Sequence, residues 1–329
     1  MEKSQFLRGL VAETDESLLG QIVLWDNAKL WIGIWRGFRK KTSLNSQLLN
    51  RIEKKLEASN DWQSAAKTSR YNHQLMKLCR LANLMDLNIP NSGSVNELNE
   101  IGLKMESMAV KLESSLNPKF TGNTIEELAT FKIKELMAEF TKHFDSMDTE
   151  KKEEAANKIL AALEELDKND RDRLLKELDV EKLTTQALVR LISVGSFGGA
   201  LATVVGISGF SAYTAVSSAI ATIFGLVGIT LPFSFYILSS SVLAFLTNPL
   251  VLIPGLIGLG FFLTKKKNKQ IKERLIPVLV TYSVLSQSPE KLRDEDETLA
   301  KAIMDETDRL RKADDSEKRD LEKAYPGLT

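Results

Sequence analysis

A single stretch of 74 residues, Leu191 to Thr264, contains no Asp, Glu, Lys, Arg or His. All 88 charged side chains lie in the other 255 residues, where they make up about one residue in three. This charge-free region (residues 191–264) is too long and too apolar to lie open to water, because large exposed apolar patches aggregate or bind other surfaces. The fold therefore has to place the region in a membrane or enclose it in a core that resembles one.

The overall composition excludes two broad classes of protein. A net charge of zero argues against a nucleic-acid binder, which normally shows a basic surplus or a basic stripe. The single cysteine, Cys79, excludes a disulfide framework and suits a reducing compartment. Acidic residues at Glu13, Asp15 and Glu16 interrupt the N-terminal sequence, so we expect no signal peptide.

Hydrophobic periodicity predicts an all-α protein with four successive parts. Residues 1–117 form a helical N-terminal domain, and residues 118–190 form charged amphipathic helices. Residues 191–264 are the apolar region of membrane type, and residues 265–329 contain a basic flank, a short apolar helix and a charged helical tail. The expected architecture is a helical N-terminal domain plus an amphipathic-helix domain that encloses or flanks a glycine-rich array of apolar helical hairpins.

Helix signals in the charged parts give boundaries that a structure can test. Pro90–Gly93 and Asn117–Asn123 are the clearest breaks, and Thr124 is a good N-cap. The predicted helices cover residues 14–41, 45–58, 61–86, 94–116, 124–144, 149–167, 171–178 and 271–287, followed by a solvated helix pair with a frayed end. The helix over 271–287 is too short to cross a bilayer, so we expect it to pack on other helices.

The helix predicted over 14–41 carries three of the four tryptophans, Trp25, Trp31 and Trp35, and ends on basic residues. An aromatic stripe with a basic end is typical of a helix that lies in a bilayer interface. The same pattern also fits a helix that turns its aromatic face toward a core. The sequence leaves both interpretations open.

Prolines and glycines divide the charge-free region. Segments 188–210 and 213–230 approach the roughly 20 apolar residues that a crossing helix needs, whereas 233–247 and 250–263 are shorter. The two short segments therefore predict a kinked span, a re-entrant pair or a buried hairpin. The expected helix breaks are Pro232, Pro249 and Pro254. The glycines expected to allow close helix packing, and with it self-association, are Gly195, Gly199, Gly206, Gly209, Gly225 and Gly228.

A basic cluster follows the charge-free region at once. Its members are Lys265, Lys266, Lys267, Lys269, Lys272 and Arg274, and they are opposed only by Glu273. Positive charge beside a spanning segment favours the cytoplasmic side and can bind anionic lipid headgroups. We therefore predict an even number of crossings with both termini cytoplasmic. The alternative is that the cluster only keeps a neighbouring apolar segment in solution.

Several short segments in and around this region resemble one known family. They are Phe210–Ala215, Gly228–Phe233, Leu238–Ser240, Asn248–Pro249 and Lys272–Val278. Together they are similar to the YaaW-like family of bacterial proteins, over roughly residues 125–287. That family has been grouped loosely with ubiquinol–cytochrome c chaperones, so the resemblance implies an assembly or chaperone role. It implies no catalytic residues, because the family has none that are known.

The sequence contains no phosphate loop, zinc-protease motif, nucleophile elbow or paired cysteines, and its two histidines, His73 and His143, are isolated. We therefore expect a non-enzymatic protein without a metal or cofactor. One hypothesis is an integral protein of the bacterial inner membrane that perturbs the membrane, maintains the envelope or acts as a scaffold. The alternative is a cytoplasmic, membrane-recruited helical bundle whose buried hairpin inserts on a trigger, as in colicin-like pore formers, or which acts as an assembly chaperone.

Overall fold

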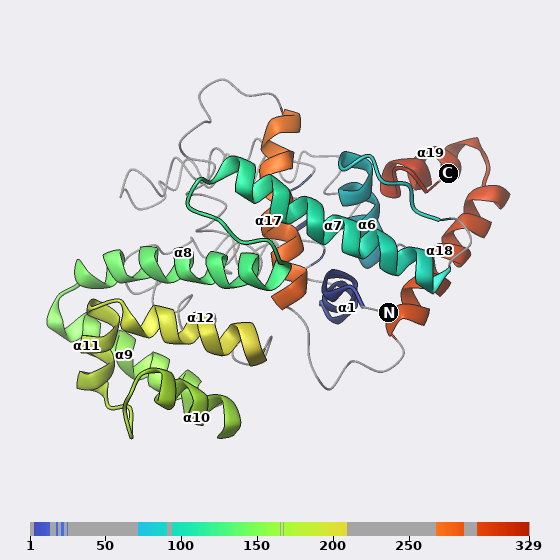
Figure 1. Ribbon diagram of the computed structural model, residues 1–329. Helices are drawn as coiled ribbons and strands as arrows, with labels where there is room; N and C mark the ends of the chain where they lie inside the picture. The colour runs from blue at the N-terminus through green and yellow to red at the C-terminus, as the bar shows by residue number, and fades with distance from the viewer. Residues whose placement is uncertain are drawn as a thin grey trace.

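The structure is a computed structural model that describes residues 3–13, 18, 21–22, 25, 72–90, 94–164, 166, 168–208, 268–285 and 295–328. Within these ranges the chain is helical and contains no strand, which confirms the all-α class (Figure 1). The helices are α1 (Gln5–Ala12), α6 (His73–Leu84), α7 (Val95–Leu116), α8 (Ile125–Asp145), α9 (Thr149–Glu164), α10 (Lys168–Glu177), α11 (Thr185–Ser193), α12 (Ser196–Ser208), α17 (Asn268–Leu285), α18 (Glu295–Lys312) and α19 (Asp315–Ala324).

The predicted break between α7 and α8 is confirmed, and its chemistry is that of a capping box. The Thr124 Oγ1 accepts a hydrogen bond from the Glu127 backbone N–H at 3.2 Å. In return, the Glu127 carboxylate accepts hydrogen bonds from the backbone N–H groups of Asn123 at 2.7 Å and Thr124 at 3.1 Å. These bonds satisfy N–H groups that a helix start leaves without partners, so α8 begins where the sequence indicates.

Two predicted helix boundaries and the predicted fraying of the tail are wrong. The helix expected over 61–86 begins only at His73, because Asn72 is extended and its side chain caps the helix by accepting from the Leu75 N–H. Segment 188–210 is not one helix, because the chain bends by 97° between α11 and α12. Gly195, with φ +79°, supplies the left-handed conformation at that bend. The tail is a helix pair as expected, but its end is not frayed, since Tyr325 and Leu328 are fully buried.

The first core is built around α17. Every residue from Leu275 to Leu285 is buried, including Pro277, Thr281 and Ser283. Helices α1, α6, α7 and α8 pack against α17, and α18 and α19 close the same core beside α6 and α7. Figure 1 shows α17, in orange, crossing α7, with α8 and α1 on either side of its lower part. The prediction that this short apolar helix packs on other helices is confirmed.

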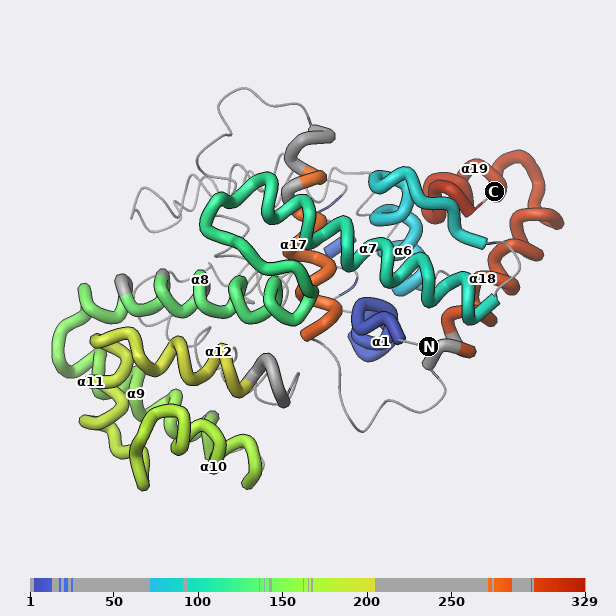
Figure 2. Tube along the Cα trace, viewed as in Figure 1, coloured from blue at the N-terminus to red at the C-terminus, as the bar shows by residue number. Residues whose placement is uncertain are grey.

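The second core lies between α8, α9, α10, α11 and α12, at the lower left of Figure 2. Its fully buried side chains include Phe140, Phe144, Ile159, Leu188 and Phe197. Helix α8 belongs to both cores, because Ile125 and Leu128 in its first turn lie in the first core. The cores thus cut across the four linear parts: residues from both ends of the chain share one core.

Candidate functional site

The charge-free region is attached to the rest of the protein at two places that the structure describes. It starts within α11 and continues through α12, and α17 begins four residues after its last residue, Thr264. Residues 209–267 lie outside the described residues. The predicted breaks and the remaining packing and basic candidates in that range are therefore not placed: Gly209, Gly225, Gly228, Pro232, Pro249, Pro254, Lys265, Lys266 and Lys267.

No single helix of the described ranges combines the length and the apolar character that crossing a membrane requires. The pair Thr185–Ser193 and Ser196–Val204 meets the requirement only when taken together, and it is bent by 97°.

The entry contact is the packing of α12 on α8. It buries Phe197, Leu201 and Val204 of α12 in the second core. Gly198 makes the closest approach, because a Cβ at this position would lie 2.6 Å from the Cβ of Met137 on α8. The entry contact is thus stabilised by the burial of apolar side chains, and the absence of a side chain at Gly198 allows the two helices to approach closely.

Of the glycines predicted to pack, the structure describes the surroundings of Gly195 and Gly199, and neither approaches another helix. A Cβ added to Gly195 or Gly199 would meet nothing within 4 Å. Gly195 lies between two helices and serves the bend, so it does not share a helix face with Gly199. Gly206 lies near the end of α12. Gly198, which is not part of the Gly195–Gly199 pattern, makes the close contact with Met137 on α8.

The exit contact is the packing of α17 on α1 and α6. At its centre, a Cβ on Gly9 would overlap the carbonyl oxygen of Ser283, so only glycine allows α1 and α17 to cross at this distance. Beside this crossing lies a buried polar cluster, here called the Lys77 cluster (Glu13, Gln21, Lys77 and Ser283). It joins the end of α1, the middle of α6 and α17.

Short hydrogen bonds connect the Lys77 cluster. Lys77 Nζ lies 2.6 Å from Glu13 Oε1 and donates to Ser283 Oγ at 2.7 Å. Ser283 Oγ in turn donates to Glu13 Oε1 at 2.5 Å, and Gln21 donates to the other carboxylate oxygen of Glu13. Loss of hydration lowers the pKa of Lys77, and the nearby Glu13 carboxylate opposes that effect.

A serine beside a buried lysine with a lowered pKa has the composition of a nucleophile–base pair. The geometry argues against that role. The Lys77 and Glu13 side chains are only 2% and 0% exposed, and Ser283 is fully buried. The Ser283 hydroxyl proton is directed to Glu13, so the three charged and polar groups already bind one another. The cluster is a structural joint between three helices.

Carboxylates of the neighbouring helices hold the start of α1. Glu106 Oε1 on α7 accepts from Ser4 Oγ at 2.6 Å and from the Phe6 N–H at 2.8 Å, and Asn99 Oδ1 accepts from the Ser4 N–H at 2.7 Å. Gln5 donates to Glu126 on α8. Burial raises the pKa of Glu106, although its two hydrogen bonds from α1 lower it. Because these partners come from other helices, α1 depends on the first core.

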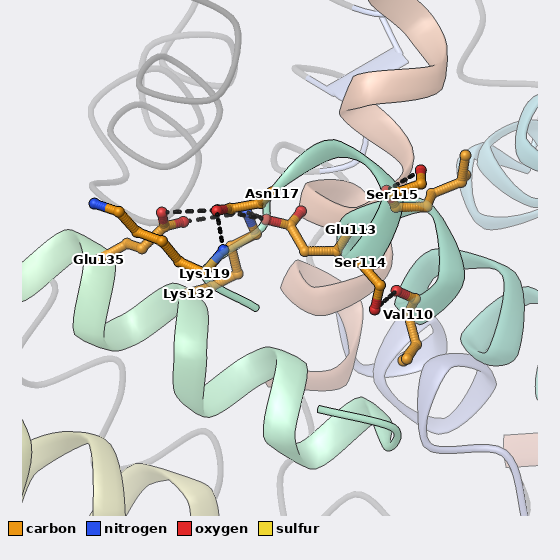
Figure 3. Close-up of polar contacts among 9 residues, drawn as sticks. Val110, Glu113, Ser114, Ser115, Asn117, Lys119, Lys132 and Glu135 are labelled. Atoms are coloured by element: carbon orange, nitrogen blue, oxygen red, sulfur yellow. Dashed lines mark hydrogen bonds and ion pairs between the residues drawn. The ribbon is translucent and has the colours of Figure 1, made fainter. Parts of the chain in front are cut away.

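A second buried ion cluster joins α7 to α8 (Figure 3). Lys132 Nζ lies 2.7 Å from Glu113 Oε1 and 3.3 Å from Glu135 Oε2, and Asn117 donates to both carboxylates at 3.1 Å. These residues come from the end of α7 and the middle of α8, as Figure 3 shows. The cluster fixes the angle at which α8 leaves the first core and enters the second.

Of the predicted lipid-binding cations, only the Lys272 side chain is described. Lys272 is half-buried, and its Nζ lies 5.5 Å from the centre of the Trp25 ring, a cation–π contact inside the protein. Lys269 and Arg274 belong to α17, but their side chains are outside the described residues. Trp25 is 4% exposed and lies in the first core, which supports the core-facing interpretation at this position. Trp31 and Trp35 lie outside the described residues.

Comparison of this chain with family models, with curated proteins and with solved structures finds no match. The resemblance to the YaaW-like family therefore stays a prediction from the segments quoted above.

Proposed function

We propose that this is a non-enzymatic, membrane-associated protein in which the charge-free region meets the bilayer while the two helical cores stay outside it. The observation that carries the proposal is the way both ends of the region are attached. Helix α12 at the entry and α17 at the exit both pack against α8, so one helix holds the two ends together.

This attachment limits the topology. If α8 and its two partners remain on one side of a membrane, the chain must leave and return on that same side. The number of crossings is then even, in agreement with the prediction from the basic cluster. Residues 191–208 are already used by α11 and α12, so 56 residues remain up to Thr264. That length accommodates two crossings of roughly 20 residues each, which form a hairpin.

Membrane fractionation tests the proposal. We expect the expressed protein to stay in the membrane pellet after a carbonate wash and to float with anionic vesicles. Replacing Lys265, Lys266, Lys267 and Lys269 by Glu is expected to reduce flotation and disturb the topology. A control replaces Lys151 and Lys158 of α9 by Glu, where no effect is expected. Recovery of the wild-type protein as a monomer in the high-speed supernatant, with no flotation, contradicts membrane association.

A second candidate is a soluble bundle that inserts its hairpin on a trigger. The observation in its favour is that apolar side chains of the bent pair α11–α12 are buried in the second core. These side chains are Leu188, Ile192 and Phe197. A supernatant monomer that floats or releases dye only after a change of pH or lipid composition supports this candidate. Constant carbonate-resistant binding supports permanent insertion instead.

A further inference from the structure

We propose that α1 is a strap that holds α17 in the first core, and that its release exposes the apolar face of α17 to the lipid surface that the charge-free region contacts. This inference rests on the proposed function for its lipid partner. The strap is defined as Ser4 to Glu13, and the face that it covers belongs to Leu275–Leu285.

Helix α1 is too short to persist alone. It has 8 residues, whereas isolated helices shorter than roughly 12–15 residues are marginal in water. Its start is held by Glu106 and Asn99 of α7, and its end by Lys77 of α6. Helices α7 and α8, which also pack on α17, have 22 and 21 residues. Of these three helices, α1 is therefore the one that depends most on its contacts with the rest of the first core.

The contact between α1 and α17 is polar at its centre. Lys77, Glu13 and Ser283 are almost fully buried there, and each regains hydration when α1 leaves. Hydration of these groups offsets part of the apolar burial that is lost. At the contact of α12 with α8 the described buried side chains are apolar, so their separation gains no comparable hydration.

What the strap covers suits a lipid surface. The segment Leu275–Leu285 is apolar, yet too short to cross a bilayer. It follows the charge-free region and its basic cluster directly in sequence. If it is uncovered, its apolar surface lies next to cations that attract anionic headgroups, a combination typical of interfacial helices. Release of α1 thus enlarges the membrane-contacting part of the protein from its C-terminal end.

Replacing Gly9 by Ala tests the strap. The added Cβ overlaps the Ser283 carbonyl, so we expect the released state to be populated about tenfold more or higher. The matched control is Gly199→Ala, whose Cβ meets nothing within 4 Å. The readouts are amide hydrogen exchange in residues 268–285 and flotation with vesicles of phosphatidylcholine containing phosphatidylglycerol. We expect both to rise in Gly9→Ala only, and we expect exchange in residues 196–204 of Gly9→Ala to stay constant.

A reversible lock covers the case in which Gly9→Ala fails to fold. A Cβ at Gly102 would lie 2.6 Å from the Cβ of Ser4, and a disulfide needs about 3.8 Å, so a shift of about 1 Å allows a bond in the variant S4C/G102C. Native Cys79 is fully buried and does not compete. The oxidised form is expected to float less than the reduced form. Equal flotation of both forms, with the wild type also floating, overturns the strap. If no form floats, the proposed membrane association is wrong. Hydrogen exchange in residues 268–285 then still tests whether α1 covers α17.

Discussion

The two helices that flank the charge-free region are held in contrasting ways. Helix α12 lies on α8 through Phe197, Leu201 and the close approach of Gly198, all in an apolar core. Helix α17 is also surrounded by apolar side chains, but its contact with α1 and α6 encloses a lysine, a glutamate and a serine. Apolar contacts are tolerant of small shifts, whereas buried ionic contacts are specific and costly when one member is missing.

This difference predicts which end of the charge-free region separates first from the helical cores. A cavity in the second core reduces the stability of the α12 contact only in part, because neighbouring side chains relax into the cavity. Loss of one charge in the Lys77 cluster leaves the other buried without a counterion. The exit contact is therefore the more sensitive of the two, and the entry contact is the more permanent.

The largest expected effect is that of Glu13→Ala. It leaves the Lys77 ammonium buried without its carboxylate, which costs about 3–5 kcal/mol of the free energy of unfolding. Urea denaturation followed by circular dichroism measures the loss. The control is the double variant Glu13→Leu/Lys77→Met, which removes both charges and is expected to recover most of it. If the single and double variants are equally destabilised, the pair contributes through packing and not through charge.

Leu201→Ala is the corresponding test of the entry contact. The leucine is fully buried in the second core, so its truncation costs about 3 kcal/mol. Hydrogen exchange separates the two regions: this variant is expected to raise exchange in α12 and leave α17 unchanged. The reverse pattern is expected for Glu13→Ala. Equal exchange increases in both helices for either variant would show that the two cores unfold as one unit.

Adjacent glycines in α12 give a smaller and opposite pair of effects. In Gly198→Ala the new methyl group meets Met137, and overpacking is expected to cost about 1–3 kcal/mol. In Gly199→Ala the methyl group meets nothing, so the higher helix propensity of Ala stabilises α12 by up to about 1 kcal/mol. Thermal denaturation of both variants checks the sign. Destabilisation of Gly199→Ala by as much as Gly198→Ala contradicts the assignment of Gly198 as the contact.

The sequence predicts the elements of this fold better than their assembly. Capping residues and prolines are local signals, so the starts of α7 and α8 follow from Ser94 and Thr124. The bend at Gly195 was missed because glycine in an apolar stretch fits close packing as well as a left-handed turn. Which glycine packs depends on the facing helix, so Met137 selects Gly198 and no local pattern indicates it.

The Lys77 cluster was also missed, although one signal was present. Lys77 interrupts the apolar stretch Leu75–Cys79, and a lysine on an apolar helix face requires a partner when it is buried. The sequence does not identify that partner, because Glu13 and Ser283 are 64 and 206 residues away. Joining both chain ends in one core likewise depends on long-range packing, which periodicity alone cannot assign.

The smallest effect concerns pH and the start of α1. Burial raises the pKa of Glu106 above its ordinary value, so the folded protein binds this proton more tightly than the unfolded chain does. The unfavourable contribution of the charged form is therefore lost as pH falls through the raised pKa, and returns as pH rises through it. Glu106 Oε1 still accepts from Ser4 and Phe6 when the other oxygen carries the proton.

We therefore expect the wild type to gain stability relative to Glu106→Gln when the pH falls from about 7.5 to about 5, because glutamine does not titrate. Urea denaturation of both proteins at the two pH values measures this difference. The sign of this stability difference also shows whether protonation of Glu106 contributes to the release of α1. If the wild type gains stability as expected, the relief of the burial cost of Glu106 outweighs the weakening of its hydrogen bonds from α1, and an acid-triggered release has to act elsewhere in the molecule. A wild type that loses stability relative to Glu106→Gln at the lower pH would instead make this carboxylate the acid-sensitive part of the exit contact.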